Sequence, residues 1–113
     1  MAETSGQPTI STHVLDTERG MPAEGIPVVL YRLDVGKAPI RMTQAMTDAD
    51  GRVRDLLERP LVAGEYRLEF AVGREDGAFF RRVAVDVFVT DVTRSYHVPL
   101  LLAPFSMTTY RGS

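Results

Sequence analysis

The sequence of 113 residues contains no cysteine and a single lysine, Lys37. Without cysteine, a thiol nucleophile, a disulfide framework and thiolate metal sites are all excluded. The formal net charge is −2, so no basic field indicates nucleic acid as a partner. No apolar run approaches the roughly 20 residues that a membrane-spanning helix needs. The remaining cations are all arginine, which favours bidentate anion binding, although overall composition explains most of them equally well.

The length and the N-terminus predict one cytoplasmic domain. A chain of 113 residues, 44% of them hydrophobic, has the size and composition of a single globular domain. Residues 1–9 form a polar N-terminal segment without the apolar centre of a secretory signal, and the domain is expected over 10–113. A domain this small buries only about two thirds of its unfolded surface, so association with further copies would stabilise it.

The hydrophobic pattern is typical of an all-β fold. In residues 64–70, Tyr66, Leu68 and Phe70 share one face while charged residues share the other, as in a strand with one buried side. Several such short runs are separated by turn signals, which favours a sandwich or a barrel. The expected strands are residues 10–15, 27–33, 42–47, 52–57, 64–70, 83–90, 96–102 and 108–111.

Three features of the second half leave the local structure less determined. Residues 83–90 and 96–102 are interpreted as a hairpin joined by a turn at 91–94. Pro99 lacks an N–H group, so the second of these strands requires a bulge or an unpaired position there. Residues 73–80 fit a short helix and an irregular loop equally well.

Two histidines, His13 and His97, are the main candidates for proton transfer, because an imidazole titrates near neutral pH. Taken singly, a strand histidine is more often a hydrogen-bonded structural residue than a catalytic one. Both lie in strands otherwise made for burial, however, where a polar ring needs partners. Their contexts, Ser11-Thr12-His13 and Ser95-Tyr96-His97, place hydroxyl groups nearby.

The segment from Asp48 to Gly51 predicts a tight turn in which Gly51 takes a positive φ, with Arg52 directly after it. It resembles part of a calcium loop, but no glutamate follows at the required position. Two histidines and a carboxylate also lack the ligand spacing of a zinc site, so no metal site is predicted. Considered alone, Arg52 is best interpreted as a solvated charge at a strand end.

The closing residues Tyr110-Arg111-Gly112-Ser113 bring together an aromatic hydroxyl, a guanidinium, a flexible glycine and a serine with the α-carboxylate. They follow an apolar run, so we expect them to lie against the domain although terminal segments are usually poorly ordered. This chemistry predicts a site that the C-terminus completes.

Six segments together carry a resemblance to a known family: 10–16, 47–52, 64–66, 96–102, 104–105 and 110–113. They resemble the 5-hydroxyisourate hydrolases, the purine-catabolic branch of the transthyretin-like family. The hormone carriers of that family lack both histidines and the closing tetrapeptide. The resemblance implies a transthyretin-like sandwich of about eight strands in two sheets, assembled as a homotetramer with active sites in a channel where dimers meet.

The resemblance also implies a function, namely hydrolysis of the cyclic amide 5-hydroxyisourate in urate degradation, without metal or cofactor. Two histidines share acid and base roles, and an arginine stabilises the oxyanion. The implied catalytic residues are His13, Arg52, His97 and Ser113. The implied substrate-binding residues are Arg52, Tyr110 and Arg111.

The match has departures, and other functions stay open. Ser95 stands where the family commonly has another histidine, and Ser106-Met107-Thr108 stands where it usually has Gly-Tyr-Ser. These positions affect the pocket wall, and neither is among the expected catalytic residues. The alternatives are a small-ligand carrier on the same sandwich, which would tolerate loss of residues 110–113, and a structural β-domain without turnover.

Overall fold

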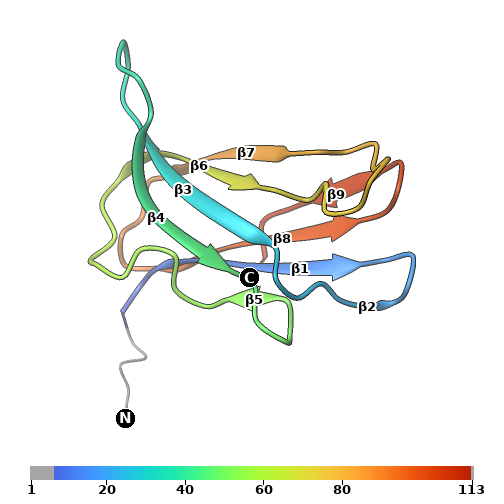
Figure 1. Ribbon diagram of the computed structural model, residues 1–113. Coiled ribbons are helices and arrows are strands. Elements are labelled where there is room, and N and C mark those ends of the chain that lie inside the picture. The colour runs from blue at the N-terminus through green and yellow to red at the C-terminus, as the bar shows by residue number, and fades with distance from the viewer. Residues whose placement is uncertain (1–6, 113) are drawn as a thin grey trace.

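The computed structural model describes residues 7–112, which form nine β-strands in two sheets (Figure 1). The predicted all-β sandwich is therefore confirmed. The strands are β1 (Ile10–Asp16), β2 (Met21–Pro22), β3 (Pro27–Leu33), β4 (Ile40–Met46), β5 (Arg52–Val53), β6 (Gly64–Phe70), β7 (Val83–Val89), β8 (Tyr96–Leu102) and β9 (Met107–Thr109). Within the described part of the chain, no helix is long and apolar enough to cross a membrane.

The two sheets differ in their pairing. The first sheet has the order β2-β1-β8-β9, and β5 pairs with β1 as well. The second sheet has the order β4-β3-β6-β7, and all of its pairs are antiparallel. In the first sheet β1 and β8 are parallel, so residues 80 or more positions apart in sequence lie side by side (Figure 1).

Strand alternation divides each sheet into a core face and an outer face. On β1, Ile10 and Val14 are fully buried, while Ser11 and His13 between them point away from the core. On β6, Tyr66, Leu68 and Phe70 fill the core from the second sheet, as their alternation predicted. The histidines of the first sheet therefore project from the outer face of the sandwich.

The predicted hairpin of residues 83–90 and 96–102 is wrong. β7 pairs with β6 in the second sheet, whereas β8 pairs with β1 and β9 in the first. The intervening turn passes from one sheet to the other, and the hydroxyl of Tyr96, a buried residue, accepts hydrogen bonds from the N–H groups of Thr90 (3.1 Å) and Asp91 (2.9 Å). This anchor fixes the crossing without strand pairing.

Several strand boundaries differ from expectation. The strand expected at 52–57 contains only Arg52–Val53, because Asp55 then accepts hydrogen bonds from the N–H groups of Leu57 and Glu58 and turns the chain. Leu57 and its neighbour Leu56 are buried from this loop and not from a strand. Residues 73–80 form turns and irregular structure without helix, and the two-residue β2 was not expected.

Pro99 interrupts the pairing of β8 with the C-terminal segment. β9 pairs with β8 as far as Leu100↔Thr109, so the strand expected at 108–111 begins one residue earlier and ends at Thr109. The pairing resumes in the same register at the bridge His97↔Gly112. Pro99 thus produces an unpaired stretch without a bulge, as its missing N–H requires.

Candidate functional site

The turn at residues 48–52 is built to present Arg52. The Asp48 carboxylate accepts hydrogen bonds from the N–H groups of Asp50 and Arg52, both at 2.9 Å, and the second of these contacts contributes most to lowering the pKa of Asp48. Gly51 has φ 78°, and a Cβ there would lie 2.4 Å from the Val14 carbonyl oxygen. Only glycine fits this close approach, so the turn predicted from sequence is confirmed in detail.

This turn also holds His13. Nε2 of His13 lies 2.8 Å from the carbonyl oxygen of Asp50, and His13 pairs with Arg52 across β1 and β5. A carbonyl oxygen accepts hydrogen bonds only, so Nε2 carries the proton of this contact. In the neutral imidazole the lone pair is then on Nδ1, which is free to accept a proton.

His97 lies on the neighbouring strand, partly buried on the same outer face. Its Nδ1 is 2.8 Å from the Ser11 hydroxyl, and Ser11 is its direct partner across β1 and β8. Burial lowers the pKa of His97, and the positive charges of Arg52 and His13 lower it further. These two charges act on His97 because the three side chains share one region of the first sheet.

The C-terminal segment crosses directly beside His97. The N–H of Gly112 donates a 2.8 Å hydrogen bond to the carbonyl oxygen of His97. The Arg111 guanidinium stacks on the core-facing ring of Tyr96, 4.5 Å from its centre. The resumed register places Tyr110 opposite Pro99, with its side chain 54% exposed.

The structure therefore gathers some of the expected site residues and not others. His13, Arg52 and His97 are brought together on the outer face of the first sheet. Arg111 is engaged with Tyr96 instead, so the structure does not bring its guanidinium to the histidines. Ser113, expected to be catalytic, lies outside the described residues.

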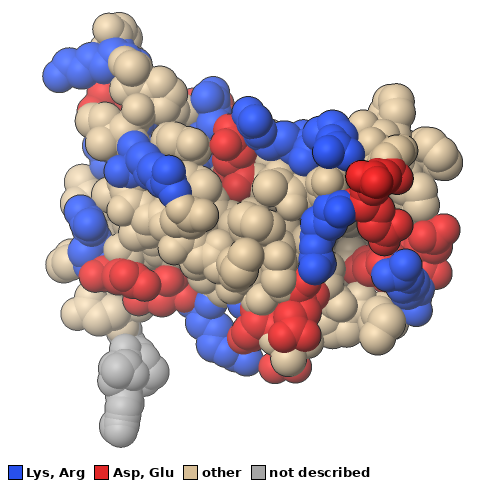
Figure 2. Space-filling model, in the orientation of Figure 1, with Lys and Arg blue, Asp and Glu red and all other residues tan. Residues whose placement is uncertain are grey.

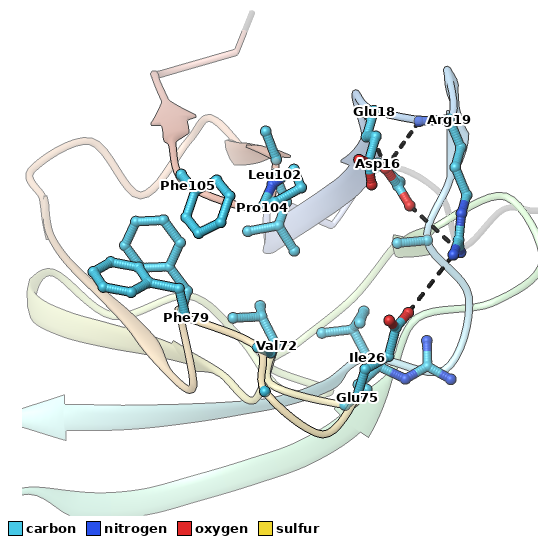
Figure 3. Close-up of a pocket in the computed structure, with 16 residues that line it drawn as sticks. Asp16, Glu18, Arg19, Ile26, Val72, Glu75, Phe79, Leu102, Pro104 and Phe105 are labelled. Carbon is cyan, nitrogen blue, oxygen red and sulfur yellow. Dashed lines mark hydrogen bonds and ion pairs between the residues drawn. The ribbon is translucent and has the colours of Figure 1, made fainter.

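A cavity away from the histidines lies at one end of the sandwich, between residues 16–19, 72–80 and 102–105 (Figure 3). Its volume is about 480 Å³. At one side of this cavity Arg19 forms ion pairs with Asp16 (3.8 Å) and Glu75 (3.6 Å), so these three side chains neutralise one another. A smaller cavity of about 280 Å³ is lined by His97, Tyr110 and Arg111 among others, so cavity size alone does not identify the site.

Among residues 7–112, no three histidine, aspartate or glutamate side chains converge to form a metal site. The polar groups around the histidines are a hydroxyl, a backbone carbonyl and a guanidinium, which are suited to proton transfer and oxyanion binding. The metal-free reaction implied by the resemblance stays a prediction.

Two residues of the site, Ser11 and Asp50, were not identified from the sequence. Ser11 lies two positions before His13 on β1, so strand alternation alone would have placed both side chains on the same outer face. Asp50 contributes a backbone carbonyl oxygen, for which no side-chain pattern gives a signal. Both hold an imidazole by a neutral group.

Fold and site together define a transthyretin-like β-sandwich with two histidines and an arginine on the outer face of one sheet. Sequence comparison agrees over almost the whole chain. The chain belongs to the HIUase/Transthyretin family, which it matches over residues 10–112.

Individual relatives sharpen this assignment. The 5-hydroxyisourate hydrolase of Mesorhizobium japonicum is 42% identical over 126 residues, covering 100% of both chains. The solved 5-hydroxyisourate hydrolase of Klebsiella pneumoniae is 36% identical with a TM-score of 0.79, covering 95% of this chain and 100% of that one. Sea bream transthyretin, solved with thyroxine, has a TM-score of 0.83 but 26% identity, covering 91% and 93%. The sandwich is common to both branches, and the higher identity is to the hydrolases.

Proposed function

We propose that this chain is an enzyme that hydrolyses 5-hydroxyisourate to 2-oxo-4-hydroxy-4-carboxy-5-ureidoimidazoline in purine degradation. The observation that carries the proposal is the convergence of His13, Arg52 and His97 on one outer face, in a chain 42% identical to a hydrolase of that name. A ligand carrier would need no titrating pair in this place, so the carrier alternative is not favoured.

His13 is the better candidate for the general base. The Asp50 carbonyl engages Nε2–H, which leaves the Nδ1 lone pair to take a proton from water. The water oxygen then attacks a ring carbonyl carbon of the substrate, the C–N bond breaks, and the ring nitrogen receives a proton. A positioned base of this kind contributes about 10²–10⁴-fold to the rate.

Arg52 supplies the positive charge that this reaction needs at the developing oxyanion. It begins β5 beside His13, and no ion pair joins its guanidinium to a carboxylate of residues 7–112. Its donors are therefore available to the substrate oxygen, where a positioned donor is worth roughly 10²–10³-fold. His97, whose pKa is lowered by burial and by the charges of Arg52 and His13, serves as the second imidazole beside the substrate.

The closing residues are proposed to complete the pocket. Tyr110 lies on the side of the sheet toward which His97 and Pro99 point, so its hydroxyl is suited to bind the substrate. Catalysis by Ser113 and substrate binding by Arg111 stay predictions, and so does the cytoplasmic location.

A homotetramer is the assembly we propose for the active form. β7 and β9 end their sheets within the described chain, and a cavity of about 280 Å³ lies beside them, lined from both sheets. Phe88 on β7 is 66% exposed, and Phe79 and Phe105 are 67% and 81% exposed. Exposed strand edges with large apolar side chains favour pairing with another copy. Light scattering of the purified protein tests this, and a monomer would overturn it.

The function is tested by following the ultraviolet absorbance of freshly generated 5-hydroxyisourate with purified protein. We expect the wild-type chain to accelerate the decay and Arg52→Ala to remove most of the acceleration while β-rich circular dichroism persists. Arg94→Ala is the matched control, because Arg94 lies in the exposed turn before β8 and its loss should leave the rate unchanged. Wild-type decay no faster than in buffer would reject the proposal.

A further inference from the structure

The imidazole of His97 is held along its Nδ1 edge by Ser11. The hydroxyl lies 2.8 Å from Nδ1 in a partly buried contact, and the two residues are direct partners across the parallel pair β1 and β8. Both side chains project from the outer face, so the contact is set by strand register. A ring nitrogen engaged in this way is not the one that meets the substrate.

The other edge of the ring is covered by Gly112. A Cβ built on Gly112 would lie 2.6 Å from Cδ2 of His97 and 3.2 Å from Cγ, so the imidazole occupies the space of the missing side chain. Gly112 is absent from the glycines with positive φ, so this contact and not its backbone conformation requires glycine. The 2.8 Å hydrogen bond from the Gly112 N–H to the His97 carbonyl oxygen holds the C-terminal segment and β8 at this spacing.

Within residues 7–112, Ser11 occupies the Nδ1 edge of the ring and Gly112 lies against its Cδ2 side, while Nε2 has no hydrogen-bond partner. We propose that Ser11 and Gly112 are positioning residues that fix His97 so that its Nε2 faces the substrate. The inference rests on the proposed function and adds to it two residues that act through the imidazole. It also explains why the C-terminal segment belongs to the site even apart from its own side chains.

Loss of either positioning residue should affect kcat more than substrate binding, because displacement of a reacting group by about 1 Å lowers the rate on the order of 10²-fold. We expect Ser11→Ala to lower kcat by about 10–100-fold with KM changed less than about threefold. Ser11→Thr keeps the hydroxyl and should retain most of the wild-type kcat. Valine has nearly the same shape as threonine but no hydroxyl, so Ser11→Val should have the lowered kcat of Ser11→Ala. Gly112→Ala should lower kcat comparably by pushing the ring aside.

Thr93→Val is the control for loss of a hydroxyl group. Thr93 is exposed in the turn between β7 and β8, where its hydroxyl donates a hydrogen bond to the Asp91 carboxylate of the same turn. We expect its kcat to equal that of the wild type. If Ser11→Ala matches this control, or if Ser11→Val is as active as Ser11→Thr, the proposal is wrong.

A second readout does not depend on activity. Nitrogen-15 spectra of the histidine side chains distinguish the two neutral tautomers, and a fixed hydroxyl partner selects one of them. We expect His97 to be a single tautomer in the wild type and a mixture in Ser11→Ala. Unchanged nitrogen shifts would overturn the positioning role even in an active enzyme, while an inactive wild type with changed shifts would reject only the proposed function.

Discussion

The outer faces of the two sheets are built by the same strand alternation, yet their polar groups are satisfied in different ways. On the second sheet Arg67 makes a bidentate contact with Asp86, at 2.7 and 3.1 Å, and Glu69 pairs with Arg82. On the first sheet the two imidazoles are held by neutral partners, a hydroxyl and a backbone carbonyl. Charge is neutralised on one face and left available on the other.

This difference determines which face is suited to chemistry. The hydrogen bond between Arg67 and Asp86 raises the pKa of the arginine and lowers that of the aspartate, so each group keeps its charge and is occupied by the other. An imidazole held by a neutral group is oriented without being given a permanent charge, and it can still exchange a proton. Figure 2 shows basic and acidic side chains around an uncharged area on one face of the molecule.

The largest expected effect separates the two faces by activity. His13→Ala and His97→Ala should each lower kcat/KM by at least about 100-fold, since each removes a proton-transfer group. Asp86→Ala on the second sheet should change it by less than about twofold, because that carboxylate touches only its own face. The decay of 5-hydroxyisourate under matched protein concentrations measures all three. Equal losses on both faces would remove the functional distinction between the sheets.

Stability, in contrast, should not distinguish the sheets. Leu68 on β6 and Leu100 on β8 are both 0% exposed and fill one shared core. Truncating either to alanine should cost about 2–5 kcal/mol of unfolding free energy through lost burial and a residual cavity. Val35→Ala, at a fully exposed position, is the control and should cost almost nothing. Denaturant unfolding measures these values, and a large difference between the two leucines would show that the sheets do not share one core.

Much of this architecture could be predicted from local sequence patterns. The period-two alternation of residues 64–70 and the turn ending at Gly51 are local features, and both were predicted correctly. The sheet to which β8 belongs depends on parallel pairing with β1, more than 80 residues away, so adjacency in sequence suggested the wrong partner. Long-range pairing has no local signal, and this is why the hairpin prediction failed.

The same limit applies to the site. The histidine, arginine and terminal motifs identified the candidate residues through their resemblance to a family, but not their contacts. That Ser11 meets His97 follows from the register of a parallel pair, and that Arg111 stacks on Tyr96 follows from where pairing resumes after Pro99. Sequence therefore supplied the chemical groups, and the three-dimensional pairing supplied their orientation.

A moderate effect is expected from pH. Burial, then the charges of Arg52 and His13, keep the pKa of His97 below its ordinary value of 6.5. As pH falls below 6.5, the His97 side chain of the unfolded chain therefore binds a proton before that of the folded chain does. The contribution of His97 to stability is thus present above that pH and is lost as the pH falls. Proton NMR should give His97 a titration midpoint below 6.5 that rises in Arg52→Met. A midpoint at or above 6.5 in the wild type would contradict the arrangement.

The smallest effect is expected from the charged pair of the second sheet. Arg67 and Asp86 are about one third exposed, at 35% and 39%, so water and salt screen their attraction. Asp86→Asn should lower the thermal midpoint far less than Leu68→Ala, and the difference from wild type should shrink in 1 M salt, where the Debye length is about 3 Å. Calorimetry at low and high salt measures this. A large decrease in the thermal midpoint that does not depend on salt would mean that the ion pair contributes to the stability of the second sheet, so that the polar groups of this face, like those of the first, do more than interact with solvent.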